Sequence, residues 1–256
     1  MRRPAGGCWF EVMKSTERHR LKENEVASTF ARLTETYEAY KQQITLGLVA
    51  VAVIVVAVVG FMMWRTQSSS QAAAMLADAM TTERAQVALP PPPGATAPAP
   101  APAGSYPTEK ARNEAALAKF MAVADAYASS ESGIVARYHA AAMLMALGRH
   151  PEAQQRYQEV IDRAGKSVYG QMAMLGKADA EVAAGKFDAA IAVYKQLSAD
   201  KDGQLPVDGI LMQLGRACDA AGKAGDARQA FKRIVDEFPQ SPYSTEAKRA
   251  LDQIKG

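Results

Sequence analysis

Few side chains in this sequence have the types and spacing that catalysis or metal binding requires. The three histidines, His19, His139 and His150, do not stand at metal-ligand spacing from a cysteine or a carboxylate. The sequence also contains no G-x-S-x-G, P-loop or H-E-x-x-H motif. Asp188 and Asp226 stand at expected turns, where helix capping accounts for them. We therefore expect no enzyme, no cofactor and no metal site.

The two cysteines and the charge distribution exclude further classes of function. Cys8 and Cys218 are too few for a disulfide framework, and Cys218 is expected as a small buried side chain on a helix. The formal charge of +3 lies entirely within residues 1–65, because residues 66–256 carry equal numbers of cations and anions. A neutral C-terminal part gives no electrostatic footprint for nucleic acid or an anionic membrane.

The most distinctive element of the sequence is an apolar stretch over residues 44–64. It carries no charge, and Thr45 is its only residue with a plainly polar side chain. A helix of this length spans roughly 30 Å, the thickness of a bilayer's hydrocarbon core. Trp64 ends the stretch and Arg65 follows it. An aromatic residue and a cation are typical of the headgroup level of a membrane. We expect one uncleaved transmembrane helix.

The orientation of this helix follows from the cations beside it. Residues 1–43 hold eight Lys or Arg, whereas the twenty residues after the span hold Arg65 and Arg84 alone. The side richer in Lys and Arg normally stays cytoplasmic. We therefore expect a single-pass protein with a cytoplasmic N-terminus and an exported C-terminal part. In a bacterial inner membrane, the setting that the family resemblance given below implies, that part lies in the periplasm.

The segments around the span have distinct compositions. Residues 1–22 are charged and without periodicity, which predicts a disordered cytoplasmic tail. Residues 23–43 are expected as a juxtamembrane amphipathic helix, because apolar residues recur there in a heptad stripe over 26–44. This stripe predicts contact with headgroups or a neighbouring protein, with a homodimer as the alternative.

After the span, residues 65–89 are rich in alanine and predict the first helix of a C-terminal domain. Residues 90–107 contain eight of the thirteen prolines and predict an extended linker.

Residues 108–256 are expected to form a helical domain built from a repeat of 37 residues. Gly148, Gly185 and Gly222 mark the repeat and are expected to end its first helices in a left-handed conformation. Five residues after each glycine stands an alanine, and four further stands an aromatic. These pairs are Ala153 and Tyr157, Ala190 and Tyr194, and Ala227 and Phe231. Ala116 and Phe120 occupy the same positions one period earlier.

The third copy, from Leu214 to Pro239, resembles the tetratricopeptide repeat, with Leu214-Gly215, Ala227, Phe231 and Pro239 at that family's spacing. The resemblance implies an all-α chain: one transmembrane helix, then a superhelix of about four helical hairpins and a C-terminal capping helix. It also implies a peptide-binding groove lined by the first helix of each hairpin. The matching residues are Val135, Tyr138, Ala142, Met145, Met172, Leu175, Asp179, Val182, Met212, Arg216 and Asp219.

The layout from about Glu23 to the end resembles the tetratricopeptide-repeat-like ancillary subunits of the Sec translocon (YfgM-like). This resemblance implies a non-catalytic scaffold that binds the translocon and periplasmic chaperones. The segment from Phe231 to Leu251 is also similar to repeats of outer-membrane assembly lipoproteins and of a cell-division coordinator. That similarity leaves envelope assembly or division as one alternative, and a permanent structural subunit of an envelope complex as another.

Overall fold

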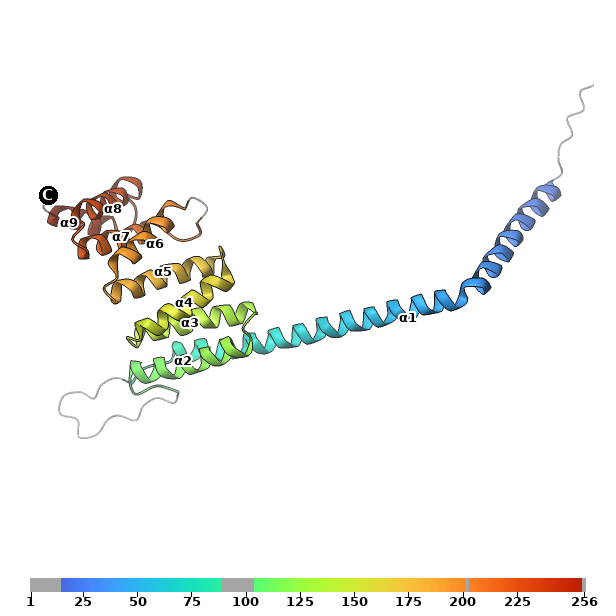
Figure 1. Cartoon of the computed structure of the whole chain (residues 1–256), viewed down its shortest axis with the longest axis horizontal. Helices are drawn as coiled ribbons and strands as arrows, with labels where there is room; N and C mark the ends of the chain where they lie inside the picture. The colour runs from blue at the N-terminus through green and yellow to red at the C-terminus, as the bar shows by residue number, and fades with distance from the viewer. Residues whose placement is uncertain (1–14, 89–103, 201–202, 255–256) are drawn as a thin grey trace, which may run out of the picture. The chain divides into compact units, whose positions relative to one another are not determined.

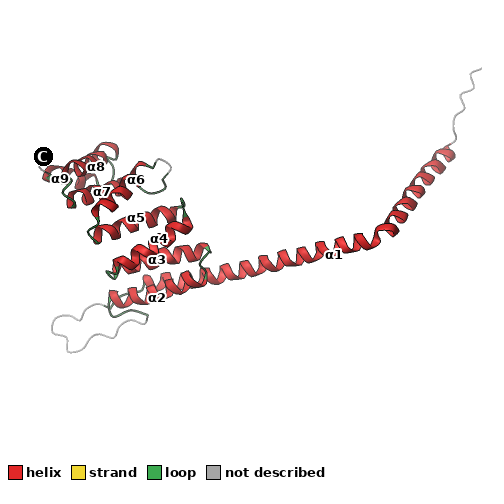
Figure 2. Ribbon diagram, in the orientation of Figure 1, coloured by secondary structure: helices red, strands yellow, loops and turns green. Residues whose placement is uncertain are grey.

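The computed structural model describes residues 15–88, 104–200 and 203–254, with side chains described from residue 40 onward except at position 44. The described part of the chain forms nine α-helices and one isolated β-bridge (Figure 2). It divides into two units, residues 1–65 and residues 66–256. Helix α1, Ser15–Glu83, begins in the first unit and ends in the second.

The first unit consists of the N-terminal part of α1. This helix begins at Ser15, within the segment where a disordered tail was expected, and the rest of that segment lies outside the described residues. The heptad stripe over 26–44 also lies almost wholly outside the described side chains. From residue 45 to residue 64 every side chain is exposed, although nearly all are apolar.

The second unit is a stack of helices in chain order, coloured from cyan to red in Figure 1. After the end of α1, each helix packs against the next one along the chain. The helices are α2 (Glu109–Ala126), α3 (Glu131–Ala146), α4 (His150–Ala164), α5 (Val168–Ala183), α6 (Phe187–Ala199), α7 (Val207–Ala220), α8 (Ala224–Glu237) and α9 (Ser244–Gln253).

Three glycines end the first helices of successive hairpins in the same way. Gly148, Gly185 and Gly222 have φ values of +73°, +73° and +71°, which confirms the expected left-handed conformation. In each case the amide of the next residue donates a hydrogen bond of 2.8 Å to the carbonyl five residues earlier, for example Arg149 N to Leu144 O. Glycine adopts this conformation without steric cost, so it reverses the chain at a fixed angle.

Close approach between neighbouring helices depends on glycine residues, which have no side chain. A Cβ atom on Gly215 would lie 2.4 Å from Cε1 of Phe231, so helix α7 accommodates this ring only because position 215 has no side chain. Gly176 on α5 does the same between successive hairpins, because its Cβ position would lie 2.5 Å from Cζ of Tyr157 on α4. Gly215 matches the repeat motif in the sequence, whereas Gly176 had not been singled out.

The end of α1 completes the first hairpin with α2. Ala79 is fully buried in the same apolar cluster as Phe120, and Leu76 and Met80 pack against that cluster. Lys119 on α2 forms an ion pair of 2.7 Å with Asp78. The chain folds back at Glu83, six residues before the expected end of this helix.

The two ends of the Pro/Ala-rich insertion lie side by side. Val87 and Tyr106 form the isolated bridge, and the Ala88 amide donates to the Tyr106 carbonyl at 2.8 Å. The Tyr106 amide in turn donates to the Gln86 carbonyl at 2.9 Å. The insertion is therefore pinned at its base, while residues 89–103 lie outside the described part.

Helix α9 closes the stack. Ala247 is fully buried in the C-terminal core, and Leu251 and Ile254 pack against that core. Lys248 and Arg249 on the other side of the helix are exposed. An apolar side toward the last hairpin and a charged side toward water are what a terminal helix of a repeat stack requires.

Candidate binding surface on the first helices

The first helices of the hairpins, namely the end of α1 with α3, α5 and α7, contribute one set of side chains to a common surface. We call this surface the first-helix face. Glu83, Tyr138 and Asp179 define its centre, one from each of α1, α3 and α5. Oε2 of Glu83 lies 3.1 Å from Nδ1 of His139, whose ring meets that of Tyr138 at 5.6 Å. Tyr138 lies 5.8 Å from Tyr157, which packs against Gly176, one turn before Asp179 on α5. Burial raises the pKa of Tyr138, and the negative charges of Asp179 and Glu83 raise it further.

The residues predicted to line a groove divide into three groups by exposure. Val135 and Met212 are buried, at 6% and 1% exposed, and therefore belong to the interior rather than to an open surface. Arg216 and Asp219 on α7 are exposed, and Arg216 forms an ion pair of 2.5 Å with Glu246. Seven others are half-buried: Tyr138, Ala142, Met145, Met172, Leu175, Asp179 and Val182.

Met212 is buried because it belongs to the C-terminal core, which residues of α6, α7 and α8 form around it. Val135 is likewise interior on α3. Both positions face the binding side in an average repeat and lie inside the stack here. The predicted surface is thus apolar over α3 and α5, and polar over α7.

Aromatic rings surround Tyr138. Its ring centroid lies 5.8 Å from that of Tyr157 on α4 and 6.2 Å from that of Tyr169 on α5. The neighbouring His139 stacks on Phe120 at 5.0 Å, and its Nδ1 lies 3.1 Å from Oε2 of Glu83. Sequence spacing indicated Tyr157 as a packing residue, but nothing in the sequence indicated that the three tyrosines would meet.

Asp179 lies half-buried beside this aromatic cluster. Its Oδ1 accepts a hydrogen bond of 2.6 Å from the hydroxyl of Tyr194 on α6. Burial raises the pKa of the Asp179 carboxyl, and the bond from Tyr194 only partly offsets that effect. Burial and this carboxylate together also raise the pKa of Tyr194. Asp179 is therefore a poorly solvated carboxylate at the surface of the helical stack.

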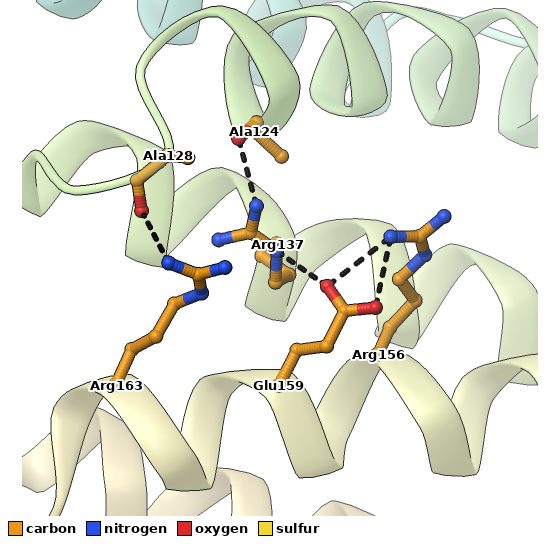
Figure 3. A network of polar contacts seen from close by, with 6 residues as sticks. All are labelled: Ala124, Ala128, Arg137, Arg156, Glu159 and Arg163. Atoms are coloured by element: carbon orange, nitrogen blue, oxygen red, sulfur yellow. Dashed lines mark hydrogen bonds and ion pairs between the residues drawn. The ribbon is translucent and has the colours of Figure 1, made fainter.

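Behind this surface a buried arginine fixes α3 between its neighbours (Figure 3). Arg137 is 3% exposed; its Nη2 donates to the Ala124 carbonyl on α2 at 2.8 Å, and its Nε lies 2.8 Å from Oε2 of Glu159 on α4. Arg156 bonds the same carboxylate at 3.1 Å, and Arg163 reaches the Ala128 carbonyl at 3.5 Å. Arg137 therefore ties α3 to both α2 and α4, next to Tyr138 in the chain.

The described side chains offer little for redox or metal chemistry. Cys218 is fully buried, and burial raises the pKa of its thiol, which disfavours the reactive thiolate. Among the described residues, no three His, Cys, Asp or Glu side chains stand close enough to hold a metal ion. The arrangement is suited to binding through apolar, aromatic and acidic groups.

Comparison with known proteins identifies the repeats. A family model described as tetratricopeptide repeat matches residues 140–206 and 175–242. A solved structure from Podosopora anserina, described as a putative kinesin light chain with nearly identical TPR-like repeats, is 16% identical with a TM-score of 0.50. The match covers 56% of this chain and 77% of that one, and at this identity it shows the fold alone. A second structure, of a variant of the same Podosopora anserina protein, is 18% identical over 56% and 85% of the two chains, with a TM-score of 0.47.

No curated protein matches the sequence at a significant level. Residues 140–242 thus carry tetratricopeptide repeats, and the all-α repeat fold expected from the 37-residue period is confirmed. Repeats of this kind typically serve as non-catalytic scaffolds for protein–protein interaction.

Proposed function

We propose that this tetratricopeptide-repeat chain is a membrane-anchored scaffold that binds segments of partner proteins on its first-helix face. The observation that carries the anchor is the apolar part of α1. The described residues contain one helix long and apolar enough to cross a membrane, and none of its most apolar part is buried. Exposure of so many apolar side chains to water costs about 25 cal/mol per Å², a cost that lipid removes.

The excess of Lys and Arg before the span supports an N-terminus in the cytoplasm and a repeat domain in the bacterial periplasm. The layout shared with ancillary translocon subunits supports the Sec translocon and periplasmic chaperones as partners. Half-buried Met145, Met172 and Leu175 support binding of apolar segments, because methionine side chains adapt to varied shapes.

Labelling of single cysteines tests the anchor and its orientation. In a Cys218→Ala background Cys8 alone reports the N-terminal side, and Asp236→Cys in a Cys8→Ala, Cys218→Ala background alone reports an exposed site in the repeat domain. In bacterial spheroplasts, a membrane-impermeant maleimide should label position 236 and leave Cys8 unlabelled until the membrane is lysed. The reverse pattern, or a chain released by alkaline carbonate, would refute the anchor as we place it.

Photocrosslinking tests the binding face. A benzophenone amino acid at Met172 should capture exported proteins, while the same group at Lys232, which is exposed on α8, should capture few. Many different products at position 172 would support a role in handing over exported chains. One stoichiometric product would instead support a permanent subunit of an envelope complex, and equal capture at both positions would contradict the assignment of this face.

A further inference from the structure

Several carboxylates at the helix interfaces have a cationic partner, whereas none is described for Asp179. Glu159 meets Arg137, Asp226 meets Lys195 at 2.7 Å, and Asp188 meets Lys223 at 2.6 Å. In the part of the chain that the structure describes, Asp179 bonds only to the Tyr194 hydroxyl.

The environment of Asp179 makes this isolation costly. The side chain is half-buried, one helical turn after Gly176, against which the ring of Tyr157 packs, and Tyr157 lies 5.8 Å from Tyr138. After burial, the charge of Asp179 also raises the pKa of both tyrosines. A carboxylate that loses solvation without gaining a cation destabilises the fold. A group that destabilises its own fold and lies on a binding face is a candidate for contact with a ligand.

The aromatic surroundings select the charge of that ligand. The faces of Tyr138 and Tyr169, whose centroids lie 6.2 Å apart, carry negative electrostatic potential and attract cations. Glu83 adds a second carboxylate to the same region, and its described partner is the imidazole of His139. Aromatic faces beside a poorly solvated carboxylate form a site for an ammonium or guanidinium group.

We propose that the first-helix face binds partner segments in which a lysine or arginine stands among apolar residues, with the cation held between Asp179 and the ring of Tyr138. The inference rests on the proposed function, because it assumes that this face binds protein segments. The half-buried Met145 and Leu175 would receive the apolar neighbours of that cation. Arg216, one repeat later at the position equivalent to Asp179, is paired with Glu246 and so provides no second site for a basic residue.

The test uses the full chain in a mild detergent and a phage library of random twelve-residue peptides. Peptides are selected on the wild-type protein, and their dissociation constants are then measured on Asp179→Asn and Asp236→Asn. Asparagine at position 179 keeps an acceptor for the Tyr194 hydroxyl. Asp236 is the matched control, because it is an exposed carboxylate for which no partner is described, so its neutralisation changes the same charge away from this face.

We expect the selected peptides to be enriched in lysine or arginine among apolar residues. Their dissociation constants should rise about tenfold on Asp179→Asn and stay unchanged on Asp236→Asn, since a tenfold change corresponds to about 1.4 kcal/mol. Replacing the peptide's basic residue by glutamine should cost the same on wild type and nothing further on Asp179→Asn. Peptides that bind without a basic residue, or equally well to Asp179→Asn, would overturn this inference and leave the binding face intact. If no peptide were selected on the wild-type protein, the proposed function itself would fail.

Discussion

Replacement of Glu159 by glutamine tests whether Arg137 fixes α3 as the structure indicates. The substitution keeps the size and shape of the side chain and removes its charge. Arg137, 3% exposed, would then retain the bond to the Ala124 carbonyl and lose its only described carboxylate. Arg156 would also lose its partner, but it is less buried and can turn toward water.

The expected cost follows from the burial of the two groups. Removal of one partner from a fully buried ion pair costs about 3–5 kcal/mol, because the other charge is left uncompensated. Glu159 is 38% exposed, so solvent already weakens the pair, and the carbonyl of Ala124 still stabilises Arg137. We therefore expect Glu159→Gln to reduce the free energy of unfolding by about 2–3 kcal/mol. In a domain of this size that corresponds to about 5–10 °C in the melting temperature.

The matched comparison is Arg137→Met, which removes the buried charge and keeps most of the side-chain volume. Because Glu159 would then be half-exposed and still paired with Arg156, this change should cost about 1 kcal/mol, less than Glu159→Gln. Thermal unfolding of the full chain in detergent, followed by circular dichroism, gives both values. If Arg137→Met proves the more damaging variant, or if the two costs add in the double variant, the buried charge is not what the carboxylate compensates.

Three further outcomes follow from single positions. Because burial raises the folded-state pKa of Asp179, its protonated form stabilises the fold at low pH and that contribution is lost as pH rises through the folded pKa. Asp179→Asn should therefore raise the melting temperature at pH 7, and the gain should vanish as pH falls below about 3.9, the ordinary aspartate pKa. Gly215→Ala should cost about 1–3 kcal/mol in urea unfolding, since the new methyl would overlap the Phe231 ring, whereas Gly225→Ala, which meets open space, should be neutral or slightly stabilising. Cys218 should react with a maleimide far more slowly than a cysteine peptide while the chain is folded, and at the peptide's rate in urea; rapid reaction in the folded state would contradict its burial.

The repeat and its turns could be predicted from the sequence because they depend on local geometry. Two features recur at a fixed period: a glycine that must adopt positive φ, and an alanine four residues before an aromatic. Neither depends on contacts with distant parts of the chain. The left-handed caps at Gly148, Gly185 and Gly222 therefore followed from spacing alone. The period at Ala116 and Phe120 indicated a further second helix, but it left open which segment pairs with it; the structure places the end of α1 there, with Ala79 in the same cluster as Phe120.

The contacts that build the binding face could not be predicted in the same way. Arg137 meets groups on two other helices, 13 and 22 residues away in the chain, and its own position shows no sign of burial in the sequence. The bond between Tyr194 and Asp179 likewise joins two repeat positions that each have an ordinary packing or surface role. Met212 was expected on the surface because the family's average geometry was applied to a position that a neighbouring hairpin covers.

The bridge between Val87 and Tyr106 makes the first hairpin tolerant of added sequence. Its hydrogen bonds join residues 86–88 to Tyr106 and do not involve the residues between them. Doubling the length of a loop costs only about 0.6 kcal/mol in closure entropy. An epitope tag or a fluorescent protein inserted between residues 88 and 104 should thus leave the packing of the helices unchanged. This position is therefore suited to insertions.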